Sequence, residues 1–195
     1  MVKLIRRCGQ NVRIVVNRMK VINLYGGPGC GKSTTAAGVF SELKQQGVNC
    51  EYVHEWIKWA VWEKRQVIFD DQLYIFAKQH HMLHSLDGQV DVAICDSPLL
   101  LSNIYGKLYT GSAMTDKPSF FPLVEECFNQ FDNTNIILER KKVYNPKGRV
   151  QTEDEACELD YKIKEYLMDN NHNFATIAGD SDAIPKIAKK VMGLL

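Results

Sequence analysis

Residues 25–35 read YGGPGCGKSTT, and this short stretch decides the class of fold. Residues 26–33 fit the pattern G-x-x-x-x-G-K-[ST]. The pattern follows an apolar run, KVINLY (20–25), and leads into a run with helical periodicity, KSTTAAGVFSELKQQ (32–46). A glycine-rich loop between a strand and a helix brings backbone N–H groups around phosphate oxygens, and the helix dipole adds positive potential. The stretch therefore predicts a phosphate-binding loop.

The loop and a later aspartate predict ATP and Mg²⁺ as ligands. Lys32 is expected to reach the β- and γ-phosphates, and the Ser33 hydroxyl to bind Mg²⁺. Asp96 ends the buried run VDVAIC (90–95), where a carboxylate can hold Mg²⁺ directly or through water. Its alternative role is that of a helix cap or turn residue. The predicted nucleotide-binding residues are Gly26, Gly27, Pro28, Gly29, Cys30, Gly31, Lys32, Ser33 and Thr34.

Apolar runs alternate with helical runs along the rest of the chain. Strands are predicted at 20–25, 48–54, 90–95, 135–140 and 173–179. Helices are predicted at 32–46, 55–65, 71–86, near 119–131, at 152–170 and at 182–195. Strands that alternate with helices form a parallel sheet covered on both faces. The sequence therefore predicts a three-layer α/β sandwich of the P-loop NTPase class.

Length and composition indicate one domain. The 195 residues suffice for a single core, which we place at 19–195, with residues 1–18 as a basic arm or an extra edge strand. A net charge of +1 gives no global attraction to nucleic acid, although a local basic groove remains compatible with it. No apolar run approaches the roughly 20 residues that span a bilayer. Isolated cysteines suit a reducing compartment, so we expect a cytoplasmic protein. The oligomeric state stays open, a homodimer included.

Five segments resemble nucleoside and nucleotide kinases of the thymidylate-kinase-like P-loop group, and small phage-encoded P-loop kinases most closely. They are YGGPGCGKSTTAAGVF, EYVHEWIKWAVWEKR, FDDQLYIFAKQ, DVAICDSPLLLS and ERKKVYNPKGR, and they span residues 20–150. The resemblance implies a five-stranded sheet of order 2-3-1-4-5 and transfer of the γ-phosphoryl of Mg·ATP to a nucleoside-type hydroxyl. The group includes the 5-hydroxymethyluracil DNA kinase. The acceptor is therefore a free nucleoside or nucleotide, a modified base within phage DNA, or another small hydroxyl compound such as nicotinamide riboside.

The resemblance also implies roles for single residues. Glu55, just after the second strand of the domain, would be the base on the acceptor hydroxyl, its alternative being a helix-starting carboxylate. Gln79 would grip a nucleobase edge, or be an exposed polar residue of its helix. The basic loop (residues 141–151) matches the lid of these kinases. Arg140 and Arg149 would stabilise the transferring phosphoryl, or belong to a solvated loop.

Three tryptophans, Trp56, Trp59 and Trp62, recur every third residue. We expect at least two of them in the core, and Trp59 is the candidate for stacking on an acceptor base.

Two features leave the function open. The related kinases carry an arginine directly after the aspartate of the third strand, whereas Ser97 and Pro98 follow Asp96 here. The missing arginine puts an ordinary nucleoside or monophosphate acceptor in doubt. The alternative function is a regulatory or nucleic-acid-associated ATPase without an acceptor. The chain is expected to be too short for a typical AAA-type module with a helical lid domain.

Overall fold

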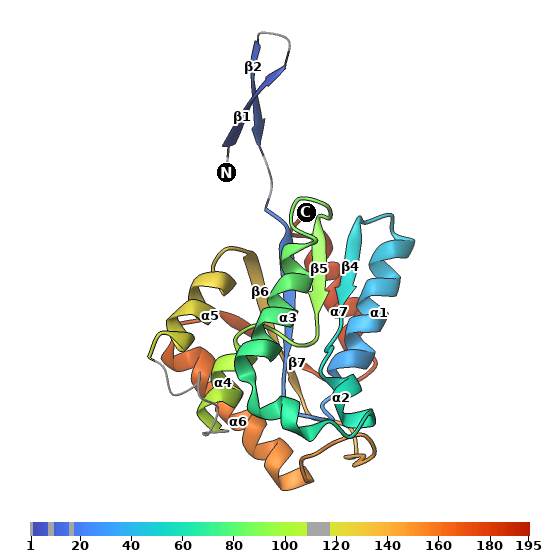
Figure 1. Cartoon of the computed structure of the whole chain (residues 1–195). Helices are drawn as coiled ribbons and strands as arrows, with labels where there is room; N and C mark the ends of the chain where they lie inside the picture. Colours follow the sequence, from blue (N-terminus) through green and yellow to red (C-terminus); the bar gives the residue numbers. More distant parts are fainter. Residues whose placement is uncertain (1, 8–9, 16–17, 109–117) are drawn as a thin grey trace.

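A five-stranded parallel sheet of order β4-β5-β3-β6-β7 forms the centre of the protein (Figure 1). The computed structural model describes residues 2–7, 10–15, 18–108 and 118–195, with side chains from residue 18 onward except 66 and 67. The strands are β3 (Lys20–Tyr25), β4 (Cys50–Val53), β5 (Val92–Cys95), β6 (Asp132–Glu139) and β7 (Phe174–Ala178). Counted from β3, this order is 2-3-1-4-5, so the predicted topology is confirmed.

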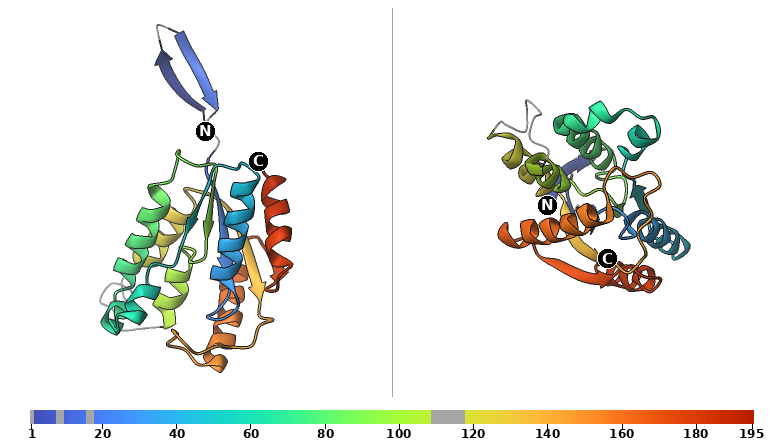
Figure 2. Two further views of the ribbon diagram at one scale, coloured as in Figure 1. Left: turned by 90° about the vertical axis from the view of Figure 1, so that its right-hand side faces the viewer. Right: turned by 90° about the horizontal axis from the view of Figure 1, so that it is seen from below.

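Helices cover both faces of the sheet, as the views in Figure 2 show. Alternation along β3 turns Ile22 and Leu24 to one face and Val21 and Tyr25 to the other. The first face packs against α1 (Lys32–Gln45) and α7 (Ala183–Met192). The helices on the second face are α3 (Gln72–His84), α4 (Leu101–Leu108), α5 (Phe120–Phe128) and α6 (Glu153–Asp169). The predicted three-layer sandwich is confirmed.

The segment after β4 departs most from the predicted elements. Instead of one helix over 55–65, a short α2 (Lys58–Trp62) is followed by a 3₁₀ turn, η1 (Gln66–Asp70). Lys64 has a φ of 56°, a left-handed conformation that ends a helix. Strand β6 also begins earlier than expected, at Asp132. The prediction for α6 agrees closely with the structure because a capping box of Thr152 and Glu155 fixes its start.

The N-terminal segment forms a two-stranded sheet of its own. Strand β1 (Val2–Arg7) pairs antiparallel with β2 (Gln10–Val15). Figure 1 shows this hairpin beyond the amino end of β3, opposite the phosphate loop. Of the expected arm or edge strand at 1–18, residues 1, 8–9 and 16–17 lie outside the described residues. Among the helices described, none has both the length and the apolar character needed to cross a membrane.

Candidate active site

The phosphate loop connects β3 to α1 at the carboxyl edge of the sheet. The Thr35 N–H donates to Gly31 O at 2.9 Å and starts the helix. The Lys32 ammonium folds back over the loop and donates to Gly26 O at 2.6 Å and Gly27 O at 3.1 Å. A cavity of about 280 Å³ lies beside the loop. The loop residues that line it are Pro28, Gly29, Gly31, Lys32, Ser33 and Thr34. The other three candidates, Gly26, Gly27 and Cys30, are buried.

An ion pair between Arg140, which directly follows β6, and Asp160 on α6 supports the backbone of the loop. The Asp160 carboxylate accepts from the Gly27 N–H at 2.5 Å through Oδ1. Its Oδ2 accepts from Arg140 Nε at 2.9 Å and forms an ion pair with Arg140 Nη2, also at 2.9 Å. Arg140 also donates from Nη1 to Pro28 O at 2.8 Å. Arg140 therefore contacts the backbone of the phosphate loop, whereas the resemblance implied a place over the transferring phosphoryl.

The metal candidates meet where β4 and β5 end. Asp96 is 1% exposed, and its Oδ2 accepts from the Tyr52 hydroxyl at 2.7 Å. Within the described residues, Asp96 Oδ1 is buried without a hydrogen-bond partner. Asp96, Tyr52 and Ser33 line a second cleft of about 530 Å³ next to the first cavity. A buried carboxylate oxygen without a partner, together with a serine hydroxyl, suits a hard cation such as Mg²⁺.

Glu55 lies at the junction of these two spaces, since it lines both of them. Burial raises the pKa of its carboxyl above the ordinary value, while the nearby Lys32 ammonium lowers it. Asp96 raises this pKa further, and Lys58 and Arg149 lower it by smaller amounts. Glu55 is thus a half-buried carboxyl within electrostatic reach of the phosphate-loop lysine and the metal candidate. Such a group can take a proton from a hydroxyl that reacts at this point.

Gln79 lies in the wall of the first cavity. It is 3% exposed and lines the cavity, so the alternative of an exposed helix residue does not apply. Its Nε2 donates to Cys95 Sγ at 3.6 Å. Across the described part of the chain, Gln79 Oε1 has no hydrogen-bond partner, although it is buried. A buried amide oxygen facing a cavity can accept a hydrogen bond from a ligand.

The tryptophans contradict the expectation that at least two are in the core. Trp59 is 63% exposed and Trp62 is 57% exposed, while Trp56 donates from Nε1 to Ile75 O at 3.3 Å. The reason is the shortness of α2, in which Ala60 is the buried residue. Trp59 lines the second cleft, and Trp62 lines both spaces. The aromatic rings therefore flank the opening of the site.

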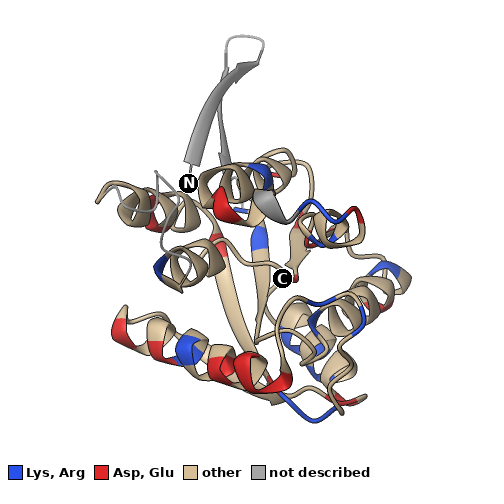
Figure 3. Ribbon diagram, turned by 60° about the horizontal axis from the view of Figure 1, so that its bottom comes forward, with Lys and Arg blue, Asp and Glu red and all other residues tan. Residues whose placement is uncertain are grey.

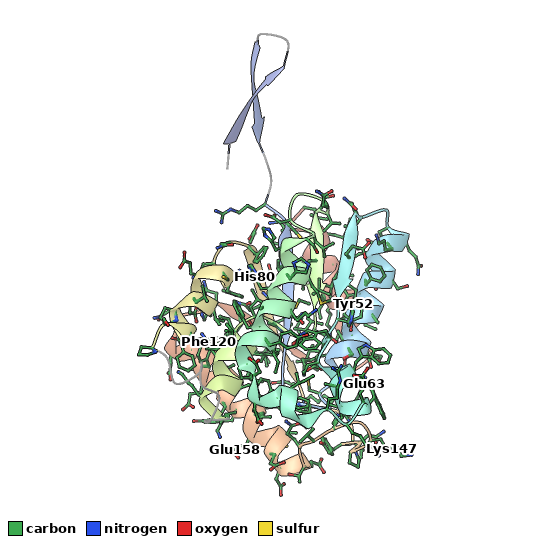
Figure 4. The ribbon with its side chains drawn as sticks, viewed as in Figure 1. Tyr52, Glu63, His80, Phe120, Lys147 and Glu158 are labelled. Atoms are coloured by element: carbon green, nitrogen blue, oxygen red, sulfur yellow. The ribbon has the colours of Figure 1, made fainter. Side chains whose placement is uncertain are left out.

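The basic loop contributes to the lining of the cavity, and its Lys and Arg residues are among those drawn in blue in Figure 3. Lys147, Gly148 and Arg149 line the cavity, and the Arg149 guanidinium lies 5.3 Å from the centre of the Tyr144 ring. Gly148 has a φ of 72°, and a Cβ there would lie 2.6 Å from Trp62 Cζ2. The Trp62 ring therefore rests directly on the turn that carries Arg149. Lys147 extends from this loop at the edge of the molecule (Figure 4).

The structure brings together Lys32, Ser33, Glu55, Gln79 and Arg149, which line one cavity. It adds Tyr52 and Asp160, which sequence reasoning missed. Neither stands in a motif, and each acts through a partner distant in the chain. The sequence offered one signal for Tyr52: side chains alternate along a strand, so Tyr52 lies on the opposite face of β4 from Glu51 and Val53.

A protein-family comparison matches residues 21–183 to a family described as an AAA domain. The chain belongs to this family. The expectation that the chain is too short for a typical AAA-type module with a helical lid domain stays a prediction. A comparison with curated protein sequences gives no match.

Among solved structures, the protein is similar to NadR in complex with NR, with 14% identity and a TM-score of 0.66 over 90% of this chain. The chain spans about half, 51%, of that NadR chain. It is also similar to the deoxyadenosine kinase from M. mycoides with bound dATP, at 18% identity and a TM-score of 0.53. That match covers 88% of this chain and 99% of the kinase. At these identities the likeness establishes a shared P-loop fold.

Proposed function

We propose that this protein is an ATP-dependent kinase that transfers the γ-phosphoryl group to a hydroxyl of a nucleoside-type acceptor. The observation that carries the proposal is the position of Glu55. Its carboxyl shares one cavity with Lys32 and Ser33, and the cavity continues to the buried amide of Gln79. A site that only hydrolyses ATP needs room for water, whereas this cavity has space and polar groups for a larger acceptor. We assign the activity to residues 19–195.

Residues of the phosphate loop would hold the nucleotide, and Ser33 and Asp96 would hold Mg²⁺. The fit of a metal rests on Asp96 Oδ1, which is buried and, among the described residues, has no partner. When bound, Mg²⁺ would neutralise charge on the β- and γ-phosphates. Lys32 would leave its carbonyl partners, Gly26 O and Gly27 O, for the phosphate oxygens. The chain itself would thus supply the backbone cradle, one ammonium and two oxygen ligands.

In the transfer step one P–O bond forms, one P–O bond breaks and one proton is transferred. The acceptor oxygen forms a bond to the γ-phosphorus while the bond from that phosphorus to the bridging oxygen breaks, and ADP leaves with that electron pair. The hydroxyl proton passes to the Glu55 carboxylate. Lys32 and Arg149 would stabilise the charge on the transferring group. Arg140 would act indirectly, through the loop backbone that it contacts.

Gln79 would bind the edge of an acceptor base, and Trp59 would stack on an acceptor at the cavity mouth. The solved structures with NR and with dATP favour a small nucleoside-type acceptor. Trp59 and Trp62 are exposed and line the site together with Lys58 and Lys147, which favours the other acceptor, 5-hydroxymethyluracil within DNA, because single bases stack on such aromatic platforms. Both acceptors present a hydroxyl to the same carboxyl.

The AAA-domain family favours a second candidate, an ATPase without an acceptor. Glu55→Gln separates the two, because it keeps the size of the side chain and removes the base. For a kinase, single-turnover transfer to the acceptor should fall by about a hundredfold or more while equilibrium ATP affinity changes by less than about threefold. If transfer were undetectable in the wild type and ATP hydrolysis were unchanged by Glu55→Gln, the ATPase would replace the kinase.

A further inference from the structure

The geometry points to Tyr52 as a positioning residue that orients Asp96 for the metal. We propose that its hydroxyl holds one oxygen of the Asp96 carboxylate, so that the other oxygen is directed to Mg²⁺. The inference rests on the metal site of the proposed function, and it adds a residue that no motif assigns to that site.

The contact joins two neighbouring strands at the edge where the phosphate loop begins. Strands β4 and β5 pair in parallel, with Tyr52 beside Ile94 and Val53 beside Cys95. The Tyr52 hydroxyl donates to Oδ2 of Asp96, the residue that directly follows β5, at 2.7 Å; Tyr52 is labelled in Figure 4. Distance and chemistry are those of a hydrogen bond to a charged acceptor, which is stronger than a neutral one.

Packing holds the Tyr52 ring in place. Its centre lies 6.5 Å from that of Phe40, on α1, and 6.4 Å from that of His54 in an edge-on arrangement. Helix α1 is the helix that begins with Lys32 and Ser33. The ring, on β4, therefore connects Asp96, which directly follows β5, with the helix that carries the other metal candidate. Because the ring is already held in place, its hydroxyl loses little conformational entropy when it forms the hydrogen bond to Asp96.

The two oxygens of Asp96 thus have different surroundings. Oδ2 is occupied by the Tyr52 hydroxyl, and Oδ1, within the described part of the chain, is buried with no partner. Asp96, Ser33 and Tyr52 line the same cleft, so the two candidate metal ligands and the phenol belong to one space. Without the phenol, both carboxylate oxygens would compete for the metal or for water, and the side chain would lose its defined orientation.

The test is the Mg²⁺ dependence of nucleotide binding, measured with a fluorescent ADP analogue and MgCl₂ on the full chain. Tyr52→Phe removes only the hydroxyl. We expect its ADP affinity without metal to stay within about twofold of the wild type. Its Mg²⁺ midpoint should rise by about tenfold, the equilibrium factor of one hydrogen bond to a charged group. Tyr161→Phe is the matched control, because Tyr161 is 67% exposed on α6, and its midpoint should not move.

Two further variants make the result decisive. In an Asp96→Asn background, Tyr52→Phe should have no additional effect on the Mg²⁺ midpoint, since the two residues act as one unit. If Tyr52→Phe fails to fold, Phe40→Leu loosens the ring and keeps the hydroxyl, and it should raise the midpoint by about threefold.

The outcomes separate the inference from the proposal beneath it. If Asp96→Asn raises the Mg²⁺ midpoint and Tyr52→Phe leaves it unchanged, the role of Tyr52 is refuted and the metal site stands. If Asp96→Asn itself leaves the midpoint unchanged, the metal site is wrong, and the inference about Tyr52 falls with it.

Discussion

Replacing Asp160 by asparagine tests whether the ion pair behind the phosphate loop organises nucleotide binding. The amide can still accept from the Gly27 N–H through Oδ1, but its NH₂ group would face the donors of Arg140. Removing one partner of a fully buried pair costs about 3–5 kcal/mol. Because the Arg140 and Asp160 side chains are 13% and 26% exposed, we expect a smaller loss of unfolding free energy, about 2 kcal/mol.

The same change should weaken ADP binding by about tenfold, since Arg140 would no longer hold Pro28 O and the loop would sample other conformations. Urea unfolding and an ADP titration measure the two effects on one preparation. The matched control is Glu158→Gln, which breaks the exposed pair with Lys162 on the same helix and should cost less than about 0.5 kcal/mol. A stability loss in Asp160→Asn with unchanged ADP affinity would refute the link between the ion pair and the loop.

Three further predictions follow from single contacts. Because the pKa of Glu55 is raised, transfer should increase with pH through that raised value, and Glu55→Gln should lose this acid limb in a pH–rate profile. Gly38→Ala would bring a Cβ against Ile184 Cδ1, so we expect the free energy of unfolding in urea to fall by about 1 kcal/mol. Ile184→Val, which removes that Cδ1, should partly restore the lost stability. An unchanged free energy of unfolding would mean that α1 and α7 are not in such close contact. Gly148→Ala should displace the Trp62 ring from the basic loop, because the new Cβ would overlap it. We expect kcat to fall by about tenfold while the affinity for ADP changes little. An unaltered kcat would show that the contact with Trp62 does not position Arg149.

The fold could be predicted from local patterns because each element carries its own signal. The phosphate loop is a contiguous motif, and the alternation of apolar strands with amphipathic helices fixes a parallel sheet. The segment after β4 was predicted less accurately, because the spacing of the three tryptophans suggests one helix with a buried stripe. The structure instead ends α2 at Trp62 and leaves two of the rings at the mouth of the site.

The supporting contacts of the site could not be predicted, because they join residues far apart in the chain. Gly27 and Asp160 are separated by 133 positions, and Tyr52 and Asp96 by 44. A resemblance can suggest that Arg140 belongs to the site, but its hydrogen bonds depend on where α6 packs. Sequence patterns therefore indicate which residues react, whereas packing decides which residues hold them in place.

The most direct test of the central claim follows labelled phosphoryl from ATP in the presence of Mg²⁺. The acceptors are a panel of nucleosides and monophosphates, together with duplex DNA that contains or lacks 5-hydroxymethyluracil. Lys32→Ala serves as the blank, since it removes the ammonium at the centre of the phosphate loop. The proposed function predicts label in one acceptor class, and in none of them with Lys32→Ala. Label found only in inorganic phosphate would contradict it.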